Sequence, residues 1–214
     1  WAEHRERLTS RFELISDVLI EASKLNPGER LTAQHIRAAV ALRRDRNGQV
    51  EDRVQRAIAD GTILIQTRGS VVGQINGLTV QALGDHAFGS PARITARSSV
   101  GRRGVINIER LVAMSGPIQQ KGSMTLQGIL MRAFAHHFPL SFDCSVTFEQ
   151  MYGGIEGDSA SMAEYIAIVS ELADVPIRQD LAITGSINQL GEAQVIGGVH
   201  HKVERAPGAL RGRE

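Results

Sequence analysis

Apolar residues in the first 60 positions recur every three or four residues, which is typical of one face of an α-helix. The first such stretch places five of them on one side: Leu8, Phe12, Ile15, Leu19 and Ala22. Asn26-Pro27-Gly28 breaks this helix, and Thr32 is suited to cap a second one. A third helix is expected over 49–60, where Gly61 ends the pattern. Residues 1–60 are therefore expected to form a helical segment.

The pattern changes after Gly61, where β-branched residues and glycines punctuate short apolar runs. Such runs predict four strands, near 71–81, 92–99, 105–108 and 140–149. Between the third and fourth strands, apolar residues return to helical spacing over about 122–137. This part of the chain therefore mixes strands with at least one helix.

A further helix is expected to begin at Ser159, because five apolar residues follow it at helical spacing: Met162, Tyr165, Ile166, Val169 and Leu172. Strands are then expected over 181–184 and 193–196, with a turn at 188–191 between them. Gly197-Gly198 leads into a last helical turn. The expected fold class is α+β, with a helical segment over 1–60, an α+β domain over 61–204 and an irregular tail over 205–214.

Composition narrows the classes of function. The hydrophobic fraction is 42%, the charged fraction 22% and the net charge +1, so nothing favours a nucleic-acid partner or an acidic membrane surface. No apolar run approaches the roughly 20 residues of a membrane span, and the first residues lack the apolar core of a signal peptide. The single cysteine, Cys144, excludes an internal disulfide. We expect a cytoplasmic protein, and the initial Trp1 suggests a piece of a longer chain.

The stretch Gly157-Asp158-Ser159-Ala160-Ser161 places a serine where a helix is expected to begin. Backbone N–H groups at such a position have no intrahelical partner. Ser159 could therefore cap the helix, help to bind an anion or act as a nucleophile. A nucleophilic serine needs a base, and none of the seven histidines stands in a nucleophile-elbow context.

A neutral lysine can replace histidine as that base. The chain has three lysines, Lys24, Lys121 and Lys202. Lys24 lies in the N-terminal helices, and Lys121 is expected in a loop after Pro117. Lys202 follows Gly197-Gly198 at the first turn of a helix, where the helix dipole disfavours a cation and should lower the lysine pKa. Lys202 is thus the best candidate for a general base.

The chain resembles the proteolytic domain of the Lon family of ATP-dependent serine proteases. The resemblance covers about residues 63–204 and rests on a series of motifs in order: Val72-Gly73-Gln74-Ile75-Asn76-Gly77-Leu78, Gly116-Pro117, Lys121-Gly122, Phe148-Glu149-Gln150, Gly153-Gly154, Gly157–Ser161, Pro176-Ile177-Arg178, Ala182–Gly185, Gly191-Glu192, Ile196–Gly198 and Lys202. The aspartate before the serine resembles the B-type branch and its bacterial Lon-like relatives. The fold that this implies is ribosomal protein S5 domain 2-like.

The resemblance implies a role for each site residue. Ser159 would be the nucleophile and Lys202 the general base, with Thr184 placed to hydrogen-bond the lysine. Backbone N–H groups around Asp158 and Ser159 would stabilise the oxyanion. Gly157 and Asp158 would support the serine, and Asp158 could either cap the helix or form an ion pair with Lys202 that keeps the site inactive.

The resemblance also implies partners. It describes a protein quality-control hydrolase that acts on unfolded or damaged proteins as a homo-hexamer with an AAA+ ATPase. No Gly-x-x-x-x-Gly-Lys-Ser/Thr loop occurs in this chain, so no cofactor is expected on it. ATP and magnesium are expected on an ATPase module upstream of Trp1, and residues 1–60 resemble the end of the small helical subdomain of such a module.

Other functions stay open at this point. The residues after Lys202 depart from the family pattern, so the chain could be a catalytically inactive module for assembly or substrate docking. The same serine and lysine could also serve an amidase for small molecules. No metal site is expected, since adjacent histidines such as His136-His137 and His200-His201 point in different directions on a helix. Cys144 is expected in the core, and Glu149 and Glu156 are either substrate contacts or polar loop residues.

Overall fold

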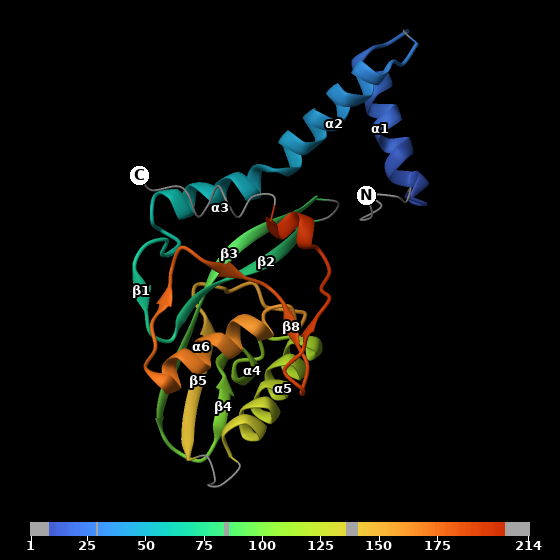
Figure 1. Cartoon of the computed structure of the whole chain (residues 1–214). Helices are drawn as coiled ribbons and strands as arrows, with labels where there is room; N and C mark the ends of the chain where they lie inside the picture. The colour runs from blue at the N-terminus through green and yellow to red at the C-terminus, as the bar shows by residue number, and fades with distance from the viewer. Residues whose placement is uncertain (1–8, 29, 84–85, 136–140, 204–214) are drawn as a thin grey trace. The chain divides into compact units, whose positions relative to one another are not determined.

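The computed structural model describes residues 9–28, 30–83, 86–135 and 141–203 (Figure 1). The chain divides into two compact units, Trp1–Arg53 with Ala82–His86 and Val54–Gln81 with Ala87–Glu214. The expected tail over 205–214, Leu8 and the His136-His137 pair lie outside the described residues. The expected domain boundary at residues 60 and 61 stays a prediction.

The N-terminal part of the first unit, before Ala82, is helical, as expected. Its helices are α1 (Phe12–Leu25), α2 (Ala33–Asn47) and the beginning of α3 (Gln49–Ala59). The side chain of Thr32 accepts a hydrogen bond from the backbone N–H of His35 at 3.4 Å, which confirms Thr32 as the cap of α2. Val18, Ala22 and Ala39 form the small buried core between α1 and α2.

The second unit is built on a five-stranded sheet with the order β4-β5-β3-β2-β7. These strands are β2 (Gln74–Leu83), β3 (His86–Val100), β4 (Gly104–Asn107), β5 (Phe142–Phe148) and β7 (Ala182–Ile183). β3 and β5 are antiparallel, whereas β4 pairs parallel with β5 and β7 pairs parallel with β2. Two short ladders complete the domain, β1 (Ser70–Val71) with β6 (Ile177–Arg178) and β8 (Ser186–Ile187) with β9 (Ala193–Gln194). The expected α+β class is confirmed.

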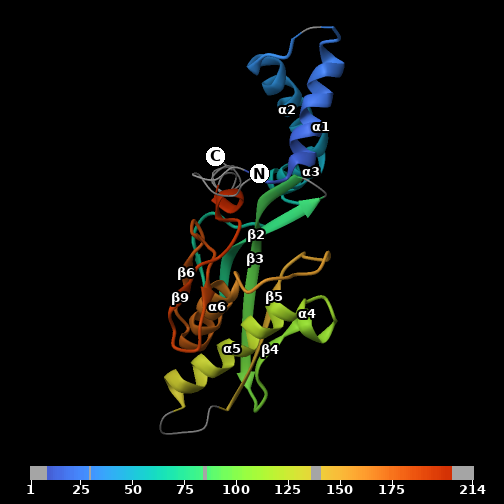
Figure 2. The same cartoon turned by 90° about the vertical axis from the view of Figure 1, so that its right-hand side faces the viewer.

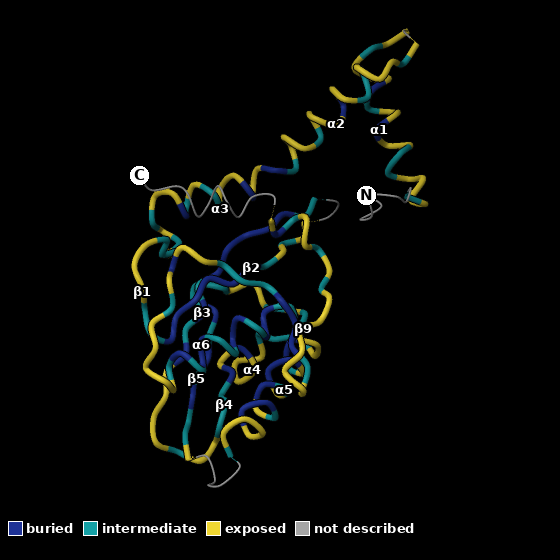
Figure 3. The backbone as a smooth tube through the Cα atoms, viewed as in Figure 1, coloured by how far each residue is buried: buried dark blue, intermediate teal, exposed yellow. Residues whose placement is uncertain are grey.

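Two helices, α5 (Pro117–Phe134) and α6 (Ser161–Ala173), pack against this sheet (Figure 2). Alternate residues of β5, namely Cys144, Val146 and Phe148, face them, so the expectation of Cys144 as a core residue is confirmed. Figure 3 shows that buried positions gather along β3, β5, α5 and α6. A short helix, α4 (Ile108–Leu111), follows β4. None of the helices in the described part of the chain is long and apolar enough to cross a bilayer.

Two helix starts differ from the sequence expectation. α5 begins at Pro117 and not near residue 122, because proline is well suited to the first helical position after Gly116. Lys121, expected in a loop, therefore lies within α5. α6 begins at Ser161, so Ser159 lies in a turn two residues before the helix rather than at its first position.

A buried amide holds the edge of the sheet to its surroundings. Asn76 of β2 is fully buried, and its Nδ2 donates to the carbonyl oxygens of Gln66 at 2.9 Å, Gln179 at 2.9 Å and Leu181 at 3.3 Å. The same region contains a hydrogen bond between the side chains of Gln74 and Gln179 at 2.9 Å. The bonds to Gln179 and Leu181 join segments that are 103 to 105 residues apart in the chain, and Leu181 directly precedes β7.

A second buried polar group lies between α5 and α6. Glu164 is 2% exposed, and its Oε1 accepts a hydrogen bond from Nε2 of Gln119 at 2.9 Å. Burial raises the pKa of Glu164 to about 7; the bond from Gln119 lowers it, and the charge of Glu109 raises it further. Glu109 itself accepts hydrogen bonds from Thr147 Oγ1 at 2.7 Å and from the backbone N–H of Phe148 at 2.8 Å.

We predict that Asn76→Ala lowers the free energy of unfolding by about 2–3 kcal/mol, because the buried amide and its three hydrogen bonds to carbonyl oxygens are lost. Urea denaturation followed by circular dichroism measures the change. Val100→Ala, at a side chain that is 95% exposed, is the control and should change the free energy by less than about 0.5 kcal/mol. Equal stability of Asn76→Ala and the unsubstituted chain would contradict the assignment.

We predict that Glu164→Gln stabilises the protein at pH 8 and has little effect near pH 4. The pKa of Glu164 is higher in the folded than in the unfolded chain, so the protonated carboxyl favours the folded state. This contribution to the free energy of unfolding is present at low pH and is lost as the pH rises through about 7. The gain at pH 8 should reach up to about 3 kcal/mol. Urea denaturation at several pH values tests this, with Glu13→Gln at an exposed position of α1 as control. A gain that is independent of pH would contradict the interpretation.

Candidate active site

The turn before α6 presents Ser159. Gly157 has a φ of +89°, a left-handed conformation that favours glycine, and a side chain there would meet no other atom within 4 Å. The backbone conformation therefore favours glycine at this position, whereas the surrounding space would admit a side chain. Two hydrogen bonds fix the turn: Ser161 N donates to Asp158 O at 3.0 Å, and Gly185 N donates to Ser159 O at 2.7 Å.

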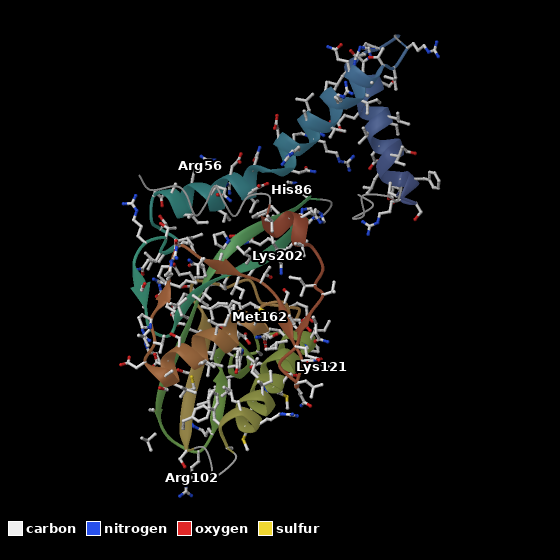
Figure 4. The ribbon with its side chains drawn as sticks, viewed as in Figure 1. Arg56, His86, Arg102, Lys121, Met162 and Lys202 are labelled. Carbon is white, nitrogen blue, oxygen red and sulfur yellow. The ribbon has the colours of Figure 1, made fainter. Side chains whose placement is uncertain are left out.

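Lys202, labelled in Figure 4, lies in the helical turn at residues 199–203. Its backbone N–H donates to the carbonyl of Gly198 at 3.1 Å, and the residue is 2% exposed. Its Nζ lies 2.7 Å from Ser159 Oγ and 2.8 Å from Thr184 Oγ1. The structure thus brings together the three side chains that the sequence singled out.

Thr184 directly follows β7 and joins the other two residues. Its Oγ1 donates a hydrogen bond to the carbonyl of Ser159 at 3.1 Å. Because the single hydroxyl proton is used in this way, the oxygen faces Lys202 as an acceptor. One N–H of the lysine is therefore directed to Thr184. The other contact of Lys202 Nζ is with Ser159 Oγ.

The environment of Lys202 favours the neutral amine. Burial is the largest cause and lowers the pKa of Lys202 below its ordinary value, while the charge of Asp158 raises it and partly opposes that effect. The direction is the one expected from the sequence. The main cause is burial of the side chain, whereas the sequence suggested the dipole of a helix terminus.

Asp158 adopts neither of the two arrangements considered from the sequence. Its Oδ2 accepts a hydrogen bond from Ser186 Oγ at 2.8 Å. α6 has Ala160 at its N-cap and no side-chain cap bond. Among the ion pairs between described residues, none joins Asp158 to Lys202. Ser186 was not recognised from the sequence, since a serine in a short strand gives no signal of its own.

Backbone donors are available beside the serine. The N–H groups of Asp158 and Ser159 take no part in the backbone hydrogen bonds recorded among the described residues. They belong to a turn that precedes a helix, where the dipole favours negative charge. An oxygen carrying developing negative charge could accept hydrogen bonds at this position.

Glu156 anchors the loop that leads to the serine. Its Oε1 accepts a hydrogen bond from the backbone N–H of Ile118 at 3.1 Å, in the first turn of α5. The N-cap of α5 is Gly116, which has no side chain, so Glu156 supplies the missing acceptor from another segment. Glu149, which directly follows β5, instead accepts a hydrogen bond from Thr95 Oγ1 of β3 at 2.7 Å. Both carboxylates thus have structural partners.

Other reactive groups have a different character. Burial raises the pKa of the Cys144 thiol to about 11, which keeps it protonated and unreactive. No group of three or more metal-ligating side chains is present within the described ranges. The rings of His200 and His201 lie 3.9 Å apart at a tilt of 44°, so they contact each other.

Comparison with known proteins agrees with this geometry. Residues 1–46 match the model of the AAA+ ATPase LID domain of archaeal LonB, and residues 152–210 match the model of the C-terminal proteolytic domain of Lon protease. The second match includes Ser159, Thr184 and Lys202.

Individual relatives extend over more of the chain. This chain is 40% identical to a putative Lon protease homolog of Escherichia coli K12, over 86% of the length of this chain. It is 36% identical to a putative Lon protease homolog of Haemophilus influenzae, over 89% of the length of this chain. It is 32% identical over 67% of its length to an archaeal Lon protease of Pyrococcus abyssi, of which the match covers 14%. The matches span about a third, 32%, of the length of each of the two bacterial relatives. The chain belongs to the Lon protease family, and it contains a LID-type helical part followed by a Lon proteolytic domain.

Proposed function

We propose that this chain is a serine endopeptidase domain that hydrolyses peptide bonds of unfolded or damaged proteins, with Ser159 as nucleophile and Lys202 as general base. The observation that carries the proposal is the 2.7 Å distance between Lys202 Nζ and Ser159 Oγ. A serine hydroxyl reacts only when a base takes its proton, and this contact is short enough for direct transfer.

The first step requires a neutral lysine. Burial lowers the pKa of Lys202, which increases the neutral fraction near pH 7. Thr184 Oγ1 accepts a hydrogen bond from one N–H of the amine, so the nitrogen lone pair can be directed to the hydroxyl proton of Ser159. Proton transfer then forms the lysine ammonium while Ser159 Oγ bonds to the carbonyl carbon of the substrate.

The negative charge moves to the carbonyl oxygen of the substrate. The N–H groups of Asp158 and Ser159 are the proposed donors to this oxyanion, and each such donor contributes about 3 kcal/mol in comparable sites. The ammonium of Lys202 then gives its proton to the leaving amine as the C–N bond breaks. Water, deprotonated by the same lysine, hydrolyses the resulting ester on Ser159 and restores the hydroxyl.

The surroundings of the domain are part of the proposal. The chain lacks a phosphate-binding loop, and its residues do not fit a nucleotide and magnesium site of that type. ATP and magnesium would act on an ATPase module elsewhere in the protein, of which the LID-type helices would be the end. We further propose that the protein assembles as a homo-hexamer and works in the cytoplasm.

We predict that Ser159→Ala and Lys202→Ala each reduce cleavage of casein by on the order of a thousandfold or more, because nucleophile and base act as one unit. Release of labelled peptides measures cleavage, and circular dichroism checks that both variants fold. A fluorophosphonate probe, which reacts with activated serines, should label the unsubstituted chain and neither variant.

The same experiment separates the alternatives. If casein is cleaved equally by all three proteins, the proposed pair of residues is wrong. If none cleaves casein and none is labelled, the chain is better described as an inactive module for assembly or docking. Turnover of small amides without cleavage of casein would indicate an amidase.

We predict that Thr184→Val lowers the rate of probe labelling by roughly 10- to 100-fold. The substitution keeps the shape of the side chain but removes the acceptor for Lys202, and a hydrogen bond to such a group contributes about 1.5–3 kcal/mol. Thr184→Ser keeps the hydroxyl and is the matched control. Equal rates for the valine and serine variants would show that the hydroxyl does not position the lysine.

A further inference from the structure

We propose that Gly89 of β3 is a positioning residue for Lys202, because its missing side chain lets the turn that carries the lysine lie directly on the strand. The inference rests on the proposed function of Lys202 as the base. It concerns a residue that lies outside the loops bearing Ser159 and Thr184 and that no motif discussed above includes.

The approach of the two backbones is close. A Cβ atom at Gly89 would lie 2.7 Å from Lys202 Cα and 2.8 Å from the carbonyl carbon of His201, and it would also collide with the His201 carbonyl oxygen. These are backbone atoms, so no side-chain rotation relieves the overlap. Any larger residue at position 89 must push the turn at 199–203 away from β3.

The neighbouring strand also lies close to the same turn. A Cβ at Gly198 would lie 3.2 Å from Cγ2 of Val80 in β2, and Gly198 has a φ of +67°. The carbonyl of Gly198 accepts the hydrogen bond from the Lys202 N–H at 3.1 Å. β2 and β3 together therefore form the surface on which the lysine turn rests.

This close seating accounts for the burial of Lys202, which is 2% exposed. Asp158 on the serine turn raises the pKa of Lys202, and His200 and His201 precede the lysine on its own turn. The strand residues that contact the turn, Gly89 and Val80, carry no charge. A lysine lifted from this surface would be solvated, and its pKa would move back toward the ordinary value.

We test this with Gly89→Ala and the fluorophosphonate probe, measuring the second-order labelling rate of this chain from pH 6 to pH 10. The neutral fraction of the amine falls about tenfold for each unit by which its pKa rises. We expect labelling near pH 7 to fall, because burial lowers the pKa of Lys202 and loss of that burial raises it, and we expect this decrease to shrink as the pH approaches 10. A merely structural defect would lower the rate at every pH.

Gly197→Ala is the matched control. It changes a glycine of the same segment, but a Cβ there would meet no atom within 4 Å, so its profile should equal that of the unsubstituted chain. Val80→Ala provides a second variant in case Gly89→Ala does not fold. It removes Cγ2, the atom nearest to where a Cβ of Gly198 would lie, at an exposed position, and should shift the profile to higher pH by a smaller amount.

The outcomes are distinct. An unshifted profile in the folded Gly89→Ala protein, or a loss that is equal at every pH, overturns the positioning role while the function of Lys202 stands. If Gly89→Ala does not fold, an unshifted profile for Val80→Ala overturns it. Labelling of Lys202→Ala at the unsubstituted rate would instead overturn the proposed function.

Discussion

The hydrogen bond between Lys202 Nζ and Ser159 Oγ joins residues that are 43 positions apart, and it forms where several segments of the second unit meet. Three segments must meet for it to form: the turn before α6, the residues after β7 and the helical turn at residues 199–203. The Ser159 carbonyl links the first two, because it accepts hydrogen bonds from Gly185 N at 2.7 Å and from Thr184 Oγ1 at 3.1 Å. The same few atoms thus define both the local fold and the candidate chemistry.

Burial of a lysine is unfavourable for the charged form, and this constraint explains the composition of the site. The hydrogen-bond partners of Lys202 Nζ are the hydroxyl oxygens of Ser159 and Thr184, and such oxygens can accept a hydrogen bond from a neutral amine as well as from a charged one. Asp158, the nearby carboxylate, is held by Ser186 and does not form an ion pair with Lys202. An ion pair would favour the charged amine more strongly, whereas from its present position the charge of Asp158 opposes the effect of burial on the Lys202 pKa only in part.

The supporting structure depends on contacts between distant segments. Glu156 provides the N-terminal acceptor for α5, because Gly116 cannot, and this bond fixes the loop that ends at Ser159. Asn76 fixes the edge of the sheet from which Thr184 emerges. β3 supplies a flat backbone at Gly89 on which the lysine turn lies. Each of these residues acts on the site without contacting a reacting atom.

The sequence by itself determined the α+β class, the three N-terminal helices and the principal strands, because periodicity is a local property of the chain. It also indicated Ser159 and Lys202 as candidate site residues, and Thr184 through the resemblance of its motifs to the Lon family. It misplaced the start of α5, where Pro117 begins the helix, and it left two arrangements for Asp158, of which the structure has neither. The tertiary structure alone decided the partner of Asp158, the cap supplied by Glu156, the burial that lowers the Lys202 pKa and the need for glycine at position 89. These depend on which distant segments touch, and no local pattern in the sequence records such contacts.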